Sequence, residues 1–237
     1  MRSLLVFERF LIHPRGIASL GHVALRYTGN HFPNEGSTVS KPATPTLAYY
    51  ATHARDFAES TANVEFSPTQ DRFAALLPPG ARILDLGCGS GRDAKHFLDA
   101  GFEVTATDGS PELCALASER AGIPVRCELF SDLADMDAYD GIWACSSILH
   151  LPRPELEDVL CKMVRALRPS GVIYTSFKHG TFEGMRNGRH FTDFTEPTLR
   201  EFLTAVPELR ILELWVTGDV RPGRETEQWL NVLLRRT

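Results

Sequence analysis

The chain lacks the features of a membrane protein and of a general nucleic-acid binder. No apolar run reaches the roughly 18 residues that a membrane-spanning helix needs. Basic residues are not in excess, since 25 Lys and Arg face 30 Asp and Glu and give a formal net charge of −5. Sequence-independent nucleic-acid binding depends on such an excess. The apolar start is broken by Glu8 and Arg9, which makes it a poor signal peptide. We therefore expect a cytoplasmic protein without membrane or nucleic-acid partners.

Several signatures of other site chemistries are also missing. The five cysteines show no C-x-x-C spacing, so we expect reduced cysteines and no disulfide framework. The histidines are scattered, and no metal site is predicted. Neither a G-x-S-x-G turn nor a P-loop lysine–serine pair occurs.

Length and composition are those of one ordinary globular domain. The chain has 237 residues, of which 43% are hydrophobic and 23% charged. Residues 1–43 differ from the rest because they show no sustained period, and 30–45 resemble a linker. They are interpreted either as a flexible arm or as a start-site artefact with the true start at Val39. We expect the folded domain over 44–237.

From residue 49 onward, predicted strands and helices alternate. Strands are expected at 82–86, 103–107, 124–129, 140–145 and 172–177, with helices at 50–61, 92–100, 110–121, 154–167 and 196–205. The run Ser67-Pro68-Thr69-Gln70 predicts a capping box that opens a further helix. Such alternation is typical of an α/β fold with a doubly wound parallel sheet. Segments 210–217 and 229–236 are joined too closely for a crossover helix, so they should be antiparallel.

A glycine-rich turn is the strongest functional signal. In the stretch Leu84-Asp85-Leu86-Gly87-Cys88-Gly89-Ser90-Gly91-Arg92-Asp93, a predicted strand meets a predicted helix. Glycine suits positive φ or close ligand approach, and a helix start attracts polar ligand groups. The spacing excludes the dinucleotide pattern G-x-G-x-x-G, whose third glycine would fall on Arg92. The turn therefore suits a nucleotide-like cofactor. Asp108 ends the next strand, where a carboxylate can accept hydrogen bonds from both ribose hydroxyls of such a cofactor.

The pattern D-x-G-x-G-x-G from Asp85, followed by Asp108, resembles motif I of the class I S-adenosylmethionine (SAM) dependent methyltransferases. The resemblance implies a Rossmann-like, seven-stranded sheet of order 3-2-1-4-5-7-6, with one antiparallel C-terminal hairpin strand. It implies that Asp85 and the loop main chain meet the methionine part, and that Asp108 meets the ribose. It also implies that Gly109, together with Ser131 or Asp132 after the third strand, flanks the adenine. The full set of cofactor-binding residues implied is Asp85, Gly87, Cys88, Gly89, Gly91, Asp108, Gly109, Ser131, Asp132 and Cys145.

Longer segments narrow the resemblance. The run 139–153 and the segments 54–57, 176–178 and 219–224 are similar to a bacterial branch of small-molecule methyltransferases that includes the tellurite-resistance type. The amino-methyltransferases of nucleic acids carry a [DN]-P-P-[YFW] turn after the fourth strand, where this chain has Ala144-Cys145-Ser146-Ser147. A small-molecule substrate is therefore expected.

Candidate catalytic residues follow the fourth and fifth strands. His150 is the candidate general base because its unperturbed pKa lies near neutrality, and its alternative is a histidine packed against Pro152. Lys178 is the second candidate, and its alternative is a solvated loop lysine. The segment 180–193 is interpreted as a glycine-rich lid loop that carries Arg189, His190 and Asp193.

Other polar and aromatic residues are open to two interpretations. Arg221 and Arg224 either bind an anionic substrate or lie in a solvated turn. Tyr49, Tyr50 and Arg55 either cap the cofactor or belong to an ordinary helix face.

Three functions are candidates. The first is SAM-dependent methyl transfer to a small molecule, and the second is a SAM-binding regulatory protein without catalysis. The third is a nicotinamide oxidoreductase, against which the glycine spacing argues. The sequence names neither the acceptor atom nor an oligomeric state.

Overall fold

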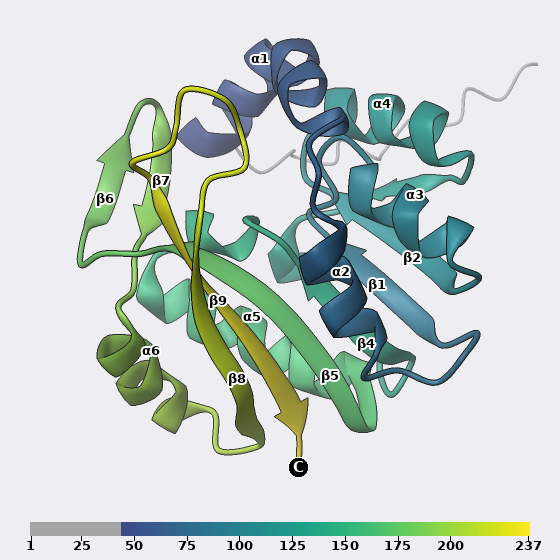
Figure 1. Cartoon of the computed structure of the whole chain (residues 1–237), viewed down its shortest axis with the longest axis vertical. Helices are drawn as coiled ribbons and strands as arrows, with labels where there is room; N and C mark the ends of the chain where they lie inside the picture. Colours follow the sequence, from purple (N-terminus) through teal and green to yellow (C-terminus); the bar gives the residue numbers. More distant parts are fainter. Residues whose placement is uncertain (1–43) are drawn as a thin grey trace, which may run out of the picture. The chain divides into compact units, whose positions relative to one another are not determined.

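A seven-stranded sheet organises residues 44–237, the part of the chain that the computed structural model describes (Figure 1). Its strands are β1 (Arg82–Leu86), β2 (Glu103–Asp108), β3 (Val125–Cys127), β4 (Tyr139–Ala144), β5 (Leu167–Lys178), β8 (Leu209–Gly218) and β9 (Gln228–Arg236). The strand order is β3-β2-β1-β4-β5-β9-β8. Strand β9 pairs antiparallel with both β5 and β8, and the other pairs are parallel. The predicted order 3-2-1-4-5-7-6 is therefore confirmed, with β8 and β9 as its sixth and seventh strands.

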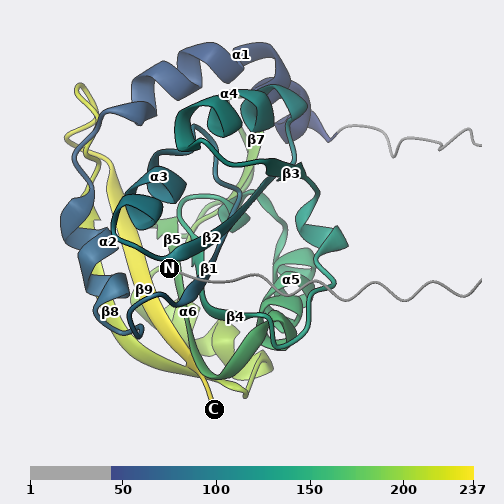
Figure 2. The same cartoon turned by 90° about the vertical axis from the view of Figure 1, so that its right-hand side faces the viewer.

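Helices cover both faces of this sheet (Figures 1 and 2). They are α1 (Pro45–Ala62), α2 (Ser67–Ala74), α3 (Arg92–Asp99), α4 (Pro111–Ala121), α5 (Arg153–Ala166) and α6 (Glu196–Phe202), with short turns η1 (Phe130–Asp132), η2 (Ile148–His150) and η3 (Leu203–Ala205). Apolar side chains of α5 and α6 pack on one face, and those of α2 and α3 on the other. Helix α1 contacts α4 and also β7 (Arg189–Thr192), a strand that lies outside the seven-stranded sheet.

Aromatic packing fixes the sheet's second face. The Trp143 ring is fully buried and stacks on Tyr174, with ring centroids 4.0 Å apart. Phe73 of α2 and Phe97 of α3 meet the same indole at 5.3 and 5.1 Å. These contacts hold both helices against β4, because large buried rings contribute most to core stability.

The segment 180–193 differs from its prediction. It contains a two-stranded hairpin, β6 (Glu183–Arg186) and β7 (Arg189–Thr192), instead of an irregular loop. Asn187 and Gly188 form its two-residue turn with φ of 51° and 78°. Positive φ at both positions is the geometry of a type I′ turn, for which Asn-Gly is the preferred pair. The prediction of a loop was wrong because this turn signal was not used.

Two helix starts also differ from the prediction. Helix α1 begins at Pro45 because the Thr44 side chain accepts a hydrogen bond from the Leu47 N–H. Helix α2 has no side-chain cap from Ser67, so the predicted capping box is wrong. Gln70 instead donates to Asp93 over 2.6 Å. Residues 1–43 lie outside the described residues, and both interpretations of them stay predictions.

Candidate functional site

The glycine turn joins β1 to α3 and contains three residues in a backbone conformation that non-glycine residues rarely adopt. Gly87, Gly89 and Gly91 have φ of 79°, 54° and 74°. A Cβ on Gly87 would lie 2.5 Å from the Cβ of Ser147, and one on Gly91 would lie 2.9 Å from the backbone of Ala117. Positions 87 and 91 therefore require glycine for two reasons, the positive φ and the close approach of neighbouring elements.

The turn is tied to the end of β2. The N–H groups of Gly87 and Cys88 both donate to the Thr107 carbonyl over 2.9 Å. The Gly89 N–H donates to Asp108 Oδ2, also over 2.9 Å. The structure thus brings the two predicted cofactor signals, the glycine turn and Asp108, into direct contact at the carboxyl ends of β1 and β2.

Asp108 is almost fully buried and organises this edge. Its Oδ1 accepts from the Ser110 N–H over 2.9 Å, in addition to the bond from Gly89. Burial raises the pKa of Asp108, while these N–H donors act in the opposite direction. A Cβ on Gly109 would lie 2.8 Å from Leu47 of α1, so α1 covers the predicted adenine side of the site.

Asp85 carries an unsatisfied carboxylate oxygen. Its side chain is buried at the end of β1, and Oδ2 has no hydrogen-bond partner among residues 44–237. Burial raises the pKa of Asp85 well above its usual range, and the nearby carboxylates of Asp93 and Asp108 add to the effect. A buried carboxylate oxygen without a partner is costly, so this position suits a cationic ligand group.

Asp93, by contrast, is fully engaged within the fold. It accepts from Gln70, from the Trp143 indole over 2.8 Å and from Arg92 over 2.7 Å. Arg92 also reaches the Cys145 sulfur at 3.9 Å. Burial raises the pKa of the Cys145 thiol to about 12, so this side chain is a neutral neighbour of the turn.

The predicted adenine-side turn lies in η1. Ser131 and Asp132 are both exposed, and the Asp132 side chain accepts from the Leu129 N–H over 3.3 Å.

The thiol of Cys88, in the glycine turn, is buried, and burial raises its pKa far above the usual range. Cofactor roles for Ser131, Asp132, Cys88 and Cys145 therefore stay predictions.

His150 faces a tyrosine that the sequence did not pair with it. Its Nδ1 lies 2.7 Å from the His190 carbonyl, which can only accept, so Nδ1 carries the proton. Nε2 is then the acceptor for the Tyr50 hydroxyl at 2.9 Å. Burial lowers the pKa of His150 to about 4, with Arg189 acting in the same direction. The imidazole is therefore neutral at pH 7 and orients the Tyr50 hydroxyl. Its role as a general base stays a prediction.

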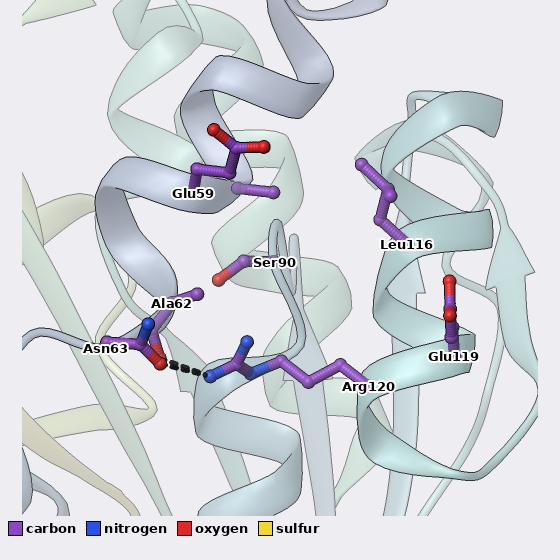
Figure 3. Close-up of a pocket in the computed structure, with 8 residues that line it drawn as sticks. Glu59, Ala62, Asn63, Ser90, Leu116, Glu119 and Arg120 are labelled. Carbon is purple, nitrogen blue, oxygen red and sulfur yellow. Dashed lines mark hydrogen bonds between the residues drawn. The ribbon is translucent and has the colours of Figure 1, made fainter.

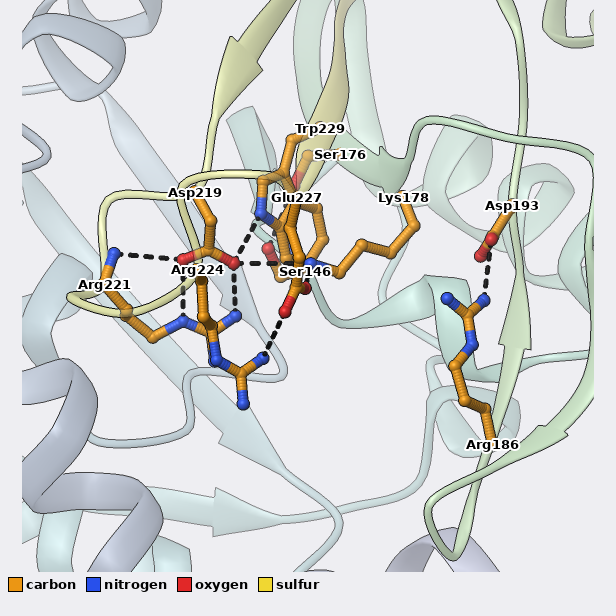
Figure 4. Close-up of polar contacts among 10 residues, drawn as sticks. All are labelled: Ser146, Ser176, Lys178, Arg186, Asp193, Asp219, Arg221, Arg224, Glu227 and Trp229. Atoms are coloured by element: carbon orange, nitrogen blue, oxygen red, sulfur yellow. Dashed lines mark hydrogen bonds and ion pairs between the residues drawn. The ribbon is translucent and has the colours of Figure 1, made fainter.

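Lys178 lies in an ion-pair cluster at the start of the β8–β9 connection (Figure 4). Its ammonium group lies 3.3 Å from Asp219 and also pairs with Glu227. Asp219 additionally accepts from Arg221 over 2.5 Å and from the Trp229 indole over 3.0 Å. The donors from Arg221 and Trp229 hold the pKa of Asp219 well below its usual range, against the effect of burial. This arrangement anchors the connection, and a catalytic role for Lys178 stays a prediction.

A pocket of about 410 Å³ lies between α1 and α4 (Figure 3). Ser90 is its contribution from the turn, and none of the predicted site residues lines it. Arg120 of α4 donates to the Ala62 carbonyl over 2.6 Å and to Asn63 over 3.0 Å. These bonds fasten the end of α1 to α4.

Membrane-spanning helices and metal-binding clusters are both absent from residues 44–237. No helix there is long and apolar enough to cross a membrane. No group of three or more His, Cys, Asp or Glu side chains is placed to hold a metal ion in that range.

Part of the chain is similar to known methyltransferases. Residues 83–171 match the family model described as a methyltransferase domain. The ubiquinone biosynthesis O-methyltransferase of Xanthomonas axonopodis pv. citri is 34% identical over 110 residues, which are 44% of this chain and 45% of that protein. The chain thus spans about half the length of the curated relatives it matches.

Solved structures show the same fold. The 1,6-didemethyltoxoflavin-N1-methyltransferase of Burkholderia thailandensis, solved with 1,6-didemethyltoxoflavin and S-adenosylhomocysteine (SAH), has a TM-score of 0.66 at 26% identity and covers 81% of this chain and 87% of its own. A TehB-like SAM-dependent methyltransferase of Corynebacterium glutamicum has a TM-score of 0.58 at 22% identity, and the match covers 81% of this chain and 98% of that protein. At that identity the likeness concerns the fold alone, so the tellurite-resistance branch stays a prediction.

Proposed function

Because residues 83–171 match a methyltransferase domain, we propose that this protein transfers the methyl group of SAM to a small-molecule acceptor. SAM is the cofactor that the comparisons support, since the B. thailandensis structure was solved with its product SAH. When bound, the sulfonium supplies a methyl group that is already activated for in-line displacement. The protein then contributes mainly by holding donor and acceptor in line.

One observation carries the proposal. Asp85 and Asp108 flank a turn of three positive-φ glycines, and Asp85 Oδ2 is buried without a partner within residues 44–237. The α-amino group of the cofactor is a cation that would satisfy this oxygen. Asp108 keeps further lone pairs for ribose hydroxyls, because a carboxylate accepts about four hydrogen bonds. The residues present therefore fit the cofactor.

The acceptor side is formed by other elements. Tyr50 of α1, His150 after β4 and Arg189 of β7 meet through hydrogen bonds at the same edge of the sheet. The hydroxyl of Tyr50, oriented by His150, is a contact for the acceptor. The acidic net charge and the absence of an [DN]-P-P-[YFW] turn support a small molecule over a nucleic-acid base.

The experiment is a product assay on the full chain. We would incubate it with SAM and a panel of phenols, thiols, amines, tellurite and selenite, and quantify SAH by mass spectrometry. Acceptor-dependent SAH release is expected. SAM binding without release for any acceptor would favour the non-catalytic regulatory alternative, and absence of SAM binding would contradict both.

A matched pair of variants tests the cofactor assignment. Asp85→Asn should weaken SAM binding by about tenfold or more, since a hydrogen bond to a charged group contributes roughly 1.5–3 kcal/mol. Asp99→Asn removes an equal charge from the exposed end of α3 and should leave the affinity unchanged. Equal affinities for the two variants would contradict the role of Asp85.

A further inference from the structure

Arg189 is a cation without a carboxylate partner in residues 44–237. It is the first residue of β7, directly after the Asn187–Gly188 turn. Its guanidinium lies over the ring of Tyr49 at 4.4 Å and beside that of Phe191 at 5.2 Å. Its Nη1 donates to the Tyr50 hydroxyl over 3.3 Å, and its Nε is buried without any partner in that range.

Other arginines at this edge are neutralised. Arg186, on the facing strand of the same hairpin, pairs with Asp193 over 2.6 Å. Arg221 pairs with Asp219 over 2.5 Å. Buried or half-buried charges are normally paired because desolvation is costly. Arg189 is therefore an exception, held in place by aromatic rings and by one neutral hydroxyl.

The free edge of this guanidinium has the shape for one class of ligand. With Nη1 bonded to Tyr50, Nε and Nη2 remain as a pair of parallel donors. That fork matches the two oxygens of a carboxylate, and such bidentate pairs are among the strongest charge-assisted hydrogen bonds. A neutral amide in the same place would offer one acceptor oxygen and would leave the cation unbalanced.

Arg189 also lies next to the residues assigned to the acceptor. It shares the Tyr50 hydroxyl with His150, and the Nδ1–H of His150 is held by the carbonyl of His190, the neighbour of Arg189. Burial has the largest effect on the pKa of Tyr50 and raises it. Arg189 lowers this pKa, and Asp108 raises it. Arg189 and the predicted ribose ligand Asp108 therefore both act on the Tyr50 hydroxyl.

We propose that the methyl acceptor carries a carboxylate, and that Arg189 binds it through its Nε and Nη2 edge. The inference rests on the proposed function, since it names the substrate class of the same site. Arg189 is then a specificity-determining residue, and the Tyr50 hydroxyl is a second contact for the acceptor.

The test measures binding to the full chain saturated with SAH. By calorimetry we would compare a set of aromatic and aliphatic monocarboxylates, 4-hydroxybenzoate among them, with their primary amides. At least one carboxylate should bind about tenfold or more tightly than its amide, a difference of roughly 1.4 kcal/mol. Arg189→Met should abolish that preference and leave SAH affinity unchanged, and Arg189→Lys should restore part of it.

Controls separate the failures. Arg186→Met removes a cation that already has a partner on the same hairpin, and it should keep the preference. Melting temperatures identify any variant that is unfolded, and Arg189→Gln then replaces Arg189→Met. If wild type binds SAH but prefers no carboxylate, or if the preference survives in Arg189→Met, this inference is wrong. If wild type does not bind SAH, the proposed function itself fails, and the inference fails with it.

Discussion

Gly87→Ala perturbs the turn at its tightest point. The added methyl group would stand 2.5 Å from the Cβ of Ser147, whose hydroxyl donates to the Leu86 carbonyl over 2.7 Å. Ser147 is buried, and rotating its side chain would not relieve the contact because its backbone sets the position of the Cβ. The turn itself must therefore move, and it carries the N–H groups that bond to Thr107 and Asp108.

The expected cost has two parts. A left-handed alanine costs about 1–2 kcal/mol of stability, and overpacking a tight site adds roughly 1–3 kcal/mol. Gly80→Ala is the matched control, because Gly80 has a φ of 72° and nothing within 4 Å of its added Cβ. The control should show the first part only.

The assay is urea denaturation of both variants, with SAH affinity measured on the folded proteins. Gly87→Ala should be less stable than Gly80→Ala by about 1–3 kcal/mol and should bind SAH at least about tenfold more weakly, while Gly80→Ala binds like wild type. Equal stabilities of the two variants would refute the close approach of the turn to Ser147. Equal SAH affinities would refute the placement of the cofactor on this turn.

Three further outcomes are expected. Asp108→Ala should weaken SAM binding by roughly 1.5–3 kcal/mol, the scale of hydrogen bonds to a charged acceptor, and an unchanged dissociation constant would count against its ribose role. The pKa of His150 is lowered from 6.5 to about 4, so its stabilising neutral form is fully present above pH 6.5 and is lost as pH falls toward 4. Unfolding free energy should therefore fall by about 2 kcal/mol between pH 7 and pH 5, and His150→Gln should flatten the profile. Asp219→Asn should destabilise the fold by about 3 kcal/mol in urea, because it leaves the buried cation of Lys178 and the partly buried cation of Arg221 short of a partner. A loss below about 0.5 kcal/mol would mean that the cluster behaves as an exposed surface pair.

The parts of the site that the sequence predicted are local in the chain. The glycine spacing and Asp85 lie within one strand–turn–helix unit, and Asp108 ends the next strand, so local periodicity placed these residues. Their cofactor roles were implied by the family resemblance. The strand order came from the family resemblance, and the structure confirms it. The short link between β8 and β9 predicted their antiparallel pairing, which the structure also shows.

The parts that the sequence did not predict depend on distant contacts or on an unused turn signal. Tyr50 and His150 are 100 positions apart, and no pattern pairs them. Gln70 fits a capping box by spacing, yet its side chain is buried and its amide N–H donates to the Asp93 carboxylate instead of its oxygen accepting at the helix start. The hairpin that carries Arg189 was within reach, because Asn187–Gly188 is a strong local turn signal.

Calorimetry of the full chain with SAH, SAM and NAD decides whether the glycine turn binds SAM. SAH and SAM should bind at one site per chain, Asp85→Asn and Asp108→Ala should weaken both, and NAD should not compete. Tight NAD binding without binding of SAH or SAM would contradict a SAM site on this turn.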